Sequence, residues 1–209
     1  MTKIDRIIEA MNEMFPEAKA ELTHENAFEL LVAVVLSAQT TDKAVNLVTP
    51  SLFKKYPTPQ FLMNADYFEV CEILKTIGLY KNKAKFIIAL AKDLVILHNA
   101  EVPNDRERLE ALPGVGRKTA NVVLSNAFGV PAIAVDTHVA RISVRLGLAK
   151  KDDNVFKIEQ KLMRKLPKDK WMKMHHQMIF FGRYHCLAKK PKCSDCPLKD
   201  ICKYEQKNT

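Results

Sequence analysis

The chain contains 209 residues, and its 33 Lys and Arg residues outnumber its 24 Asp and Glu residues, which gives a formal net charge of +9. A chain of this length can bury a hydrophobic core in one or two domains without disulfides, and its basic balance favours a polyanionic partner. The longest apolar run, Leu30–Leu36, is far shorter than the ~20 residues that span a bilayer, and the N-terminus lacks a signal-peptide pattern. We therefore expect a cytoplasmic protein with no membrane partner.

The apolar pattern predicts an all-α fold. Apolar residues recur every three to four positions along the chain, and no alternating strand pattern with a hairpin turn occurs. The expected helices cover Ile4–Phe15, Phe28–Leu36, Asp42–Phe53, Tyr67–Thr76, Asn82–His98, Arg106–Ala111, Arg117–Phe128, Thr137–Leu146, Val155–Leu166 and Trp171–Tyr184.

Two segments share a pattern of helix, tight turn and helix. Residues 78–84 repeat the glycine, basic and alanine positions of residues 114–120. Tyr80 takes the place of Gly116, so the first turn cannot approach a phosphate as closely as the second. This first turn either projects Leu79 and Tyr80 outward as a wedge for DNA or packs Leu79 into the core.

The second turn, Leu112–Ala120, predicts a phosphate site. Gly114 and Gly116 permit positive φ and close approach of a ligand to the backbone, and a new helical pattern begins directly after them. The free N–H groups of a helix N-terminus bind anions, and the phosphate of a nucleic acid suits the basic chain. An ordinary glycine-rich turn between two helices is the alternative.

Two residues near this turn can carry chemistry. A positioned amine such as that of Lys118 can attack an electrophilic carbon and form a Schiff base, although a lysine beside a phosphate site is commonly a phosphate contact. Asp136 follows an apolar run and precedes a helix, which predicts an N-cap. The same carboxylate can also stabilise a developing positive charge or help to move a proton, because capping and catalysis are compatible. His138 is either a phosphate donor or a solvated helix residue.

Four of the five cysteines, Cys186, Cys193, Cys196 and Cys202, crowd into the C-terminal tail and are interpreted as metal ligands. Only one Cys-x-x-Cys pair is present, which favours an iron–sulfur cluster over zinc, although four thiolates also suit zinc. Cys71 lies in an apolar pattern with Phe68 and Leu74 and is expected to be a buried structural thiol. No chemistry is assigned to His175, His176 or His185, because their spacing matches no zinc site or catalytic triad.

Taken together, the hairpin Leu112–Thr119, the segment Val135–Val139 and the four cysteines resemble the endonuclease III family of helix-hairpin-helix DNA glycosylases. The resemblance covers nearly the whole chain. It implies a six-helix barrel domain over residues 21–131 and a helical iron–sulfur domain over residues 1–20 and 132–209. A 4Fe-4S cluster would lie in the second domain, and DNA would bind in a cleft between the two.

The same resemblance implies a bifunctional enzyme of base excision repair. Lys118 would be the nucleophile and Asp136 the essential carboxylate, while Gln39 and Leu79 would fill the stack that a flipped nucleotide leaves. The substrate would be double-stranded DNA with oxidised pyrimidines or abasic sites, bound by a monomer at the nucleoid. The expected DNA contacts come from Leu112, Gly114, Val115, Gly116, Thr119, His138, Lys189 and Lys190.

The cluster itself is expected to have a structural task. Its predicted role is to fold the loop between Cys186 and Cys193, which carries Lys189, Lys190 and Lys192 as a preorganised phosphate clamp. For any one of these lysines, plain surface solvation is the alternative.

Two other functions compete with this interpretation. The related adenine-removing glycosylase uses a glutamate where Val34 lies here, and it lacks the lysine nucleophile. A helix-hairpin-helix module that only binds DNA is the second alternative, and the presence of both Lys118 and Asp136 argues against it.

Overall fold

The computed structural model describes residues 1–205, and every regular element within that range is a helix. The chain divides into two compact units, one formed by Ala20–Val130 and the other by Met1–Lys19 together with the chain from Pro131 onward. No helix within residues 1–205 combines the length and the apolar character that crossing a bilayer requires. The expectation of an all-α fold is confirmed.

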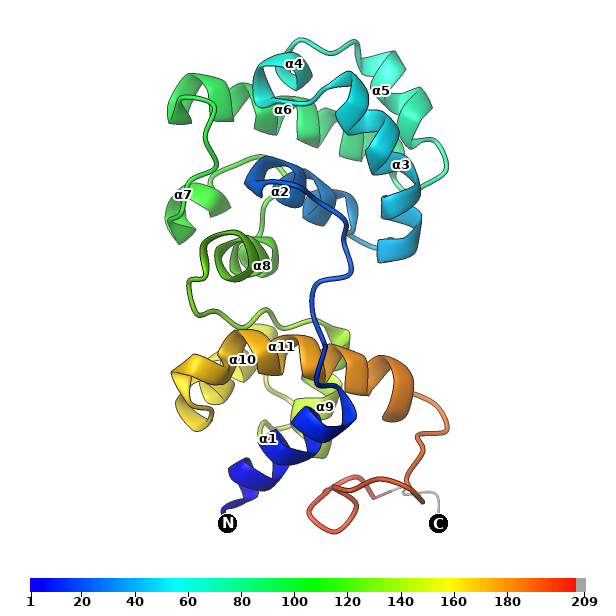
Figure 1. Cartoon of the computed structure of the whole chain (residues 1–209), viewed down its shortest axis with the longest axis vertical. Helices are drawn as coiled ribbons and strands as arrows, with labels where there is room; N and C mark the ends of the chain where they lie inside the picture. Colours follow the sequence, from blue (N-terminus) through cyan, green and yellow to red (C-terminus); the bar gives the residue numbers. More distant parts are fainter. Residues whose placement is uncertain (206–209) are drawn as a thin grey trace. The chain divides into compact units, whose positions relative to one another are not determined.

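The unit Ala20–Val130 is built around α2, which is buried on every side. Phe28 and residues 30–36 are all apolar and buried, so the helix is stable only inside a core. Asn26 caps its start by accepting a hydrogen bond from the Glu29 N–H. The helix packs against α3, α6 and α8 (Figure 1). The helices of this unit are α2 (Ala27–Leu36), α3 (Asp42–Lys55), α4 (Pro59–Met63), α5 (Tyr67–Leu74), α6 (Tyr80–His98), α7 (Arg106–Glu110) and α8 (Arg117–Phe128).

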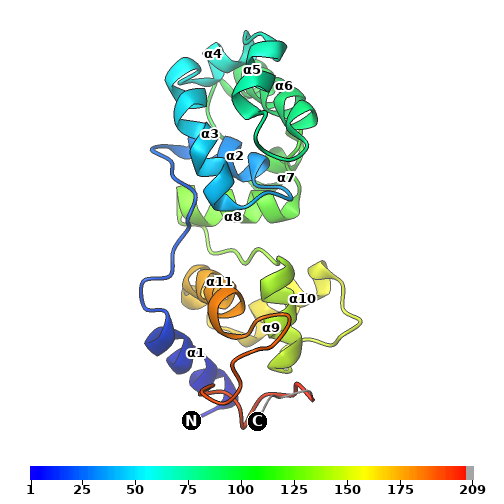
Figure 2. The ribbon, with the colours of Figure 1, turned by 90° about the vertical axis from the view of Figure 1, so that its right-hand side faces the viewer.

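The second unit is assembled from both ends of the chain. It contains α1 (Lys3–Met14), α9 (Thr137–Arg145), α10 (Val155–Lys165) and α11 (Trp171–Phe180), and a 3-10 turn at Lys168–Lys170 precedes α11. Within this unit, α11 lies between α1 and the pair α9 and α10 (Figure 2). The Gln177 side chain on α11 donates hydrogen bonds to the Met11 and Phe15 carbonyls, which ties the end of α1 to the core.

The C-terminal tail returns to α1 and closes this unit. Arg6 forms a bidentate ion pair with Asp200, with nitrogen–oxygen distances of 2.7 and 3.0 Å, and Lys3 donates to the Ile201 carbonyl. A two-pronged Arg–carboxylate contact fixes the orientation of both partners. The tail is therefore attached to the first helix of the chain.

The observed helices differ from the expected ones at several ends: α3 continues two residues further, to Lys55, and α5 stops two residues sooner, at Leu74. The single-turn helix α4 was not expected. Helix α6 begins at Tyr80, two residues early, because Leu79 adopts a left-handed conformation and forms the N-cap itself. The last helix ends at Phe180 as an α-helix, and residues Phe181–His185 continue as one π-helical turn.

Candidate active site and iron–sulfur centre

The turn between α7 and α8 leaves the N-terminus of α8 open to a ligand. Gly116 is the N-cap of α8, and it has no side chain that could accept from the first N–H groups of the helix. These N–H groups have no partner inside the helix, and the helix dipole gives this end a partial positive charge. The turn is held in shape by the Val115 N–H, which donates to the Leu112 carbonyl at 3.1 Å.

The two glycines of this turn are required for different reasons. Gly114 has φ +76°, and a Cβ there would lie 3.1 Å from the Phe86 side chain and 3.3 Å from Val35, so the fold itself demands glycine. Gly116 has an ordinary negative φ, and a Cβ there would meet no atom within 4 Å. Neither side-chain packing nor the backbone conformation requires a glycine at position 116. The missing side chain there leaves the surface open to a ligand.

The other hairpin residues fall into two groups. The side chains of Leu112 and Val115 are buried in the core, so they can reach DNA only through their backbone. Lys118 is exposed in the first turn of α8, and Thr119 beside it is half-buried. The hairpin therefore offers backbone N–H groups and one exposed amine on the same short stretch.

Asp136 is both a cap and a half-buried carboxylate. The buried segment Ala132–Val135 leads into it, and its Oδ1 accepts a hydrogen bond from the Val139 N–H at 2.8 Å, which begins α9. The expectation that Asp136 caps this helix is confirmed. It belongs to the unit that contains α9, whereas Lys118 belongs to the other unit.

His138 lies against Arg141 and the backbone of Gly182. Arg141 Nη2 lies 3.2 Å from His138 Nδ1 and donates to the Gly182 carbonyl at 2.7 Å. Burial, together with the positive charges of Arg141 and Arg183, lowers the pKa of His138. Asp136 and a backbone hydrogen bond with Gly182 oppose this decrease.

The π-helical turn exists where α11 approaches this pair. A Cβ at Gly182 would lie 2.9 Å from His138 Cβ and 3.1 Å from Arg141 Nη2. Only a glycine allows the end of α11 to come this close to α9. Arg141 lies one helical turn after His138, whereas nothing in the sequence marks Gly182 as their partner, because it lies about forty positions away.

Gln39 and Leu79 lie at the tips of two turns, and both are exposed. The Leu79 side chain is 56% exposed, so the alternative in which Leu79 packs into the core is wrong, and Tyr80 is half-buried against the core. Gln39 and Leu79 also share a left-handed backbone, with φ of +54° and +58°. Residues other than glycine, Asn and Asp rarely adopt this conformation.

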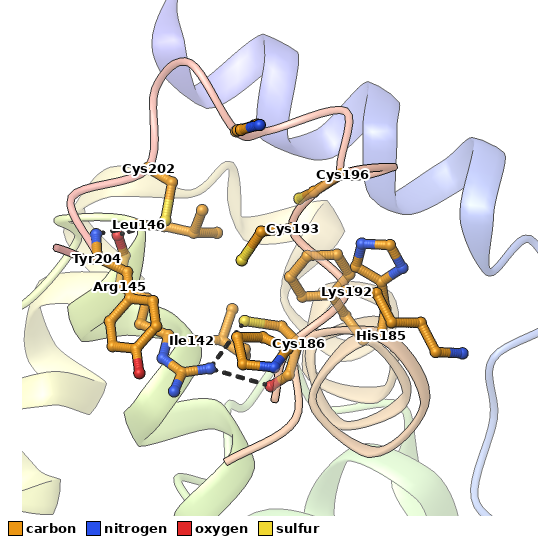
Figure 3. A pocket seen from close by; sticks show the side chains of 13 residues that line it. Ile142, Arg145, Leu146, His185, Cys186, Lys192, Cys193, Cys196, Cys202 and Tyr204 are labelled. Carbon is orange, nitrogen blue, oxygen red and sulfur yellow. Dashed lines mark hydrogen bonds between the residues drawn. The ribbon is translucent and has the colours of Figure 1, made fainter. Parts of the chain in front are cut away.

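The four tail cysteines surround one pocket. Cys186, Cys193, Cys196 and Cys202 all line a space of about 400 Å³ in the unit that contains α9 (Figure 3). Burial raises the pKa of the Cys186 and Cys196 thiols, while Arg145 opposes the increase at Cys186. Four thiols around one partly buried space fit an all-thiolate centre. Cys71 lies elsewhere and is buried, as expected, although Phe68 from the same pattern is exposed.

Arg145 organises this pocket, and sequence reasoning did not identify it. Its guanidinium donates to the carbonyls of Cys186, Leu187 and Ala188 and lies 3.2 Å from Cys186 Sγ, and it stacks over the Tyr204 ring (Figure 3). A cation at this position stabilises thiolate charge and holds the backbone between the first and second cysteines. The donors that the structure places here therefore fit a negatively charged cluster.

The loop between Cys186 and Cys193 presents its lysines to solvent. Lys189, Lys190 and Lys192 are exposed, and Lys190 has a left-handed backbone with φ +52°. The Lys192 N–H donates to the His185 carbonyl at 3.1 Å, and Arg145 holds the other side of the loop. Their ammonium groups are thus carried on a backbone with fixed anchor points.

Two family models match the chain. The model of the HhH-GPD superfamily of base excision DNA repair proteins covers residues 32–168, which includes the hairpin, Lys118 and Asp136. The model of the iron–sulfur binding domain of endonuclease III covers residues 186–202, from the first tail cysteine to the last.

Relatives match over almost their whole length. Endonuclease III of Bacillus subtilis strain 168 is 53% identical over 207 residues, which cover 99% of this chain and 94% of the relative. Endonuclease III of Escherichia coli strain K12 is 46% identical over 201 residues, which cover 96% of this chain and 95% of the relative.

Solved structures agree with the fold. A trapped covalent intermediate of an endonuclease III with DNA superposes with a TM-score of 0.93 at 54% identity, covering 97% of this chain and 96% of that one. A thermostable thymine-DNA glycosylase superposes with a TM-score of 0.87 at 22% identity, covering 99% and 98%, and this second likeness concerns the fold alone.

Proposed function

Because the chain belongs to the endonuclease III family of helix-hairpin-helix base excision repair proteins, we propose that Lys118 and Asp136 carry its chemistry. The enzyme is a DNA glycosylase and AP lyase, and its cofactor is the 4Fe-4S cluster of the family. The observation that carries the assignment of Lys118 is its exposed amine in the first turn of α8, directly beside an uncapped helix N-terminus.

The hairpin supplies binding and the nucleophile together. A DNA phosphate accepts hydrogen bonds from the N–H groups of the first turn of α8, where Gly116 leaves room for the phosphate to approach the backbone, and Gly114 and Thr119 lie on either side of this contact. The neutral amine of Lys118 then attacks C1′ of the deoxyribose, the glycosidic bond breaks, and the base leaves with its electron pair and a proton. C1′ then carries the Lys118 nitrogen and the ring oxygen O4′. The C1′–O4′ bond breaks, the proton on nitrogen passes to O4′, and C1′ and Lys118 form an imine.

The lyase step follows from this imine. Loss of a C2′ proton moves electrons toward the imine and expels the 3′ phosphate by β-elimination, and water then releases Lys118. The product is a strand nicked at the former lesion. Lys118 is restored as an amine, so the cycle balances without an electron donor or acceptor.

Asp136 stabilises the positive charge that develops on the sugar as the base departs. Its Oδ1 is committed to the α9 cap, so we assign the electrostatic task to the carboxylate as a whole, with its other oxygen nearer the sugar. His138, two residues after Asp136, contributes a ring N–H to a phosphate.

The substrate is double-stranded DNA with an oxidised pyrimidine or an abasic site, which the enzyme binds as a monomer, since one chain supplies both Lys118 and Asp136. A glycosylase cannot reach its target inside a duplex, so the nucleotide is flipped out and the exposed tips Gln39 and Leu79 fill the space. Residues 21–131 act as the barrel domain, and residues 1–20 with 132–209 act as the cluster domain. With DNA as its substrate, the enzyme works at the nucleoid.

The cluster supplies a covalent crosslink among the four cysteines when it is bound. Arg145 and the bound thiolates hold the loop that presents Lys189 and Lys190 to the phosphates. Ordering this loop in advance lowers the entropy that DNA binding costs. Base excision and β-elimination transfer no electron, so these steps need only the fold that the cluster maintains.

Borohydride trapping tests the proposal. The enzyme is incubated with duplexes that contain thymine glycol, dihydrothymine, an abasic site, a mispaired adenine or no lesion, and the imine is reduced to a stable adduct. We expect adducts with the first three duplexes and none with undamaged DNA. Release of adenine without an adduct would favour the adenine-removing relative, and tight binding without adduct or excision would identify a silent binding module.

A further inference from the structure

Lys83 is a buried lysine that connects the two turns carrying Gln39 and Leu79. Its side chain is only 4% exposed, although lysine is among the residues least often buried. The Lys83 Nζ donates to Thr40 Oγ1 at 2.5 Å, across 43 positions of the sequence. The Lys83 backbone N–H donates to the Leu79 carbonyl at 3.0 Å. One residue therefore contacts both turns.

The two turns also touch each other directly. A Cβ built at Gly78 would lie 3.9 Å from Thr40 Oγ1 and 4.0 Å from the Gln39 carbonyl oxygen. Gln39, which precedes Thr40, and Leu79, which follows Gly78, are the two left-handed residues at the tips. A shift of one tip would therefore move the other, through the contact of Gly78 with Thr40 and the Gln39 carbonyl.

Left-handed conformations of Gln and Leu cost free energy, and they persist only where the surrounding structure enforces them. Helix capping does not account for them in the usual way, because Leu79 caps α6 without a side-chain hydrogen bond. The Lys83 contact to Thr40 supplies such enforcement at both turns. Burial lowers the pKa of the Lys83 ammonium, because this environment opposes the charge.

We propose that Lys83 is a positioning residue that couples the Gln39 and Leu79 tips through Thr40, so that the two tips enter the base stack as one rigid unit. The proposal rests on the roles proposed above for Gln39 and Leu79. It assigns Lys83 no contact with DNA and no part in bond breaking. Its contribution lies in the step that extrudes the nucleotide.

Thr40→Val and Thr40→Ser form the first test pair. Valine keeps the shape of threonine and removes the hydroxyl, while serine keeps the hydroxyl. We expect Thr40→Val to slow single-turnover excision of a correctly paired lesion roughly tenfold, because extrusion of a paired base costs the most. We expect Thr40→Ser to retain most of the wild-type rate.

Lys83→Met forms the second test, with Lys92→Met as the control for loss of an exposed lysine from the same helix. Lys83→Met should match the defect of Thr40→Val, and the double variant should be no slower than either single variant, because both remove one interaction. If Lys83→Met fails to fold, the Thr40 pair still decides the question.

A readout specific to positioning separates this role from a merely structural one. The defect should shrink when the lesion is mispaired or lies in single-stranded DNA, because extrusion then costs less. Equal losses on paired, mispaired and single-stranded substrates would overturn the proposal and leave Lys83 as a stabilising core residue.

Leu79→Ala separates failure of this proposal from failure of the proposed function. Slow excision by Leu79→Ala with normal excision by Lys83→Met and Thr40→Val would overturn the coupling and leave the tip role intact. Normal excision by all three variants would overturn the tip role and the coupling together, while the adducts formed through Lys118 would still stand.

Discussion

Asp136 Oδ1 accepts a hydrogen bond of 2.8 Å from the Val139 N–H, so the carboxylate that we propose for catalysis is also the N-cap of α9. A cap fixes the carboxylate in direction, because the helix it begins is packed into the core. The same bond makes structural and chemical roles difficult to separate by alanine substitution. An amide separates them.

Asp136→Asn should therefore fold normally and lose excision. The amide oxygen can still accept from Val139, whereas the charge that stabilises the sugar cation is gone, so single-turnover excision should fall by roughly 10²-fold or more. Asp66→Asn is the matched control. Asp66 caps α5 in the same way, by accepting a hydrogen bond of 3.0 Å from the Glu69 N–H, and it has no part in the proposed chemistry. A loss under about threefold, or roughly 0.6 kcal/mol of barrier, would mean that Asp136 acts only as a helix cap.

Lys118→Gln should abolish borohydride trapping and strand cleavage, because the amide cannot form an imine. Binding to damaged duplex should persist, with the slope of log affinity against log salt reduced by no more than about one. Lys81→Gln, an exposed lysine in the first turn of α6, should keep its adduct. A wild-type yield of adduct from Lys118→Gln would mean that another amine is the nucleophile.

Gly116→Ala and Gly114→Ala should fail in opposite ways. At Gly116 an added methyl group meets no atom of the chain, so stability should fall by only about 0.5 kcal/mol while DNA affinity falls roughly tenfold. At Gly114 the left-handed φ and the close Phe86 side chain should cost about 2 kcal/mol of stability. Thermal unfolding and titration with duplex DNA measure both. Unchanged affinity in Gly116→Ala would mean that this turn does not bind a DNA phosphate.

Cys193→Ser should lose the iron–sulfur centre and with it the ordered basic loop. A hydroxyl is a harder and poorer ligand than a thiolate, so the purified variant should lack the visible colour, iron and sulfide of the wild type. Limited proteolysis should cut the variant near Lys189 and Lys190 faster than the wild type. Cys71→Ala, which removes a buried thiol of the other unit, should keep its iron. One stoichiometric zinc in place of iron would contradict the assignment.

Stability should fall as the pH is lowered, and His176 should account for part of the fall. Burial lowers the pKa of His176 from its ordinary 6.5 to about 4, so the unfolded chain binds the proton first. The stability contribution is complete above pH 6.5, is lost as the pH falls toward 4, and amounts to about 2 kcal/mol between pH 7 and pH 5. His176→Gln should show a smaller change in melting temperature across this range than the wild type. Parallel changes would place the titration elsewhere.

The sequence predicted best where local signals coincide. Helix α8 was expected at Arg117–Phe128 and is found there, because Gly116 and Gly129 bound an amphipathic run on both sides. The four cysteines are identifiable by spacing, and the pocket they line confirms their grouping. Local pattern and tertiary structure agree at these places.

The features that sequence reasoning missed are long-range contacts. Arg145 reads as a polar residue on an amphipathic helix, yet it is buried against carbonyls more than forty positions away. Lys83 stands at helical spacing before Ile87 and Leu90 on the buried face of α6, but the pattern does not reveal its bond to Thr40, 43 positions away. The helix α4 spans about one turn, which is too short to establish periodicity, and the π-helical turn depends on Gly182 meeting His138. Spacing along the chain carries none of this information.

The assembly of one unit from both ends of the chain has a consequence for the order in which the protein folds. The unit Ala20–Val130 is continuous, so all of it has left the ribosome before the last part of the chain is synthesised. Helix α1 must wait for α11 and for Asp200 before its partners exist. Domains form as units during synthesis, and the N-terminal one usually forms first. Here α1 is synthesised before Ala20–Val130 but finds its partners only after it, so the unit that takes up iron can be completed only after the hairpin unit has been synthesised.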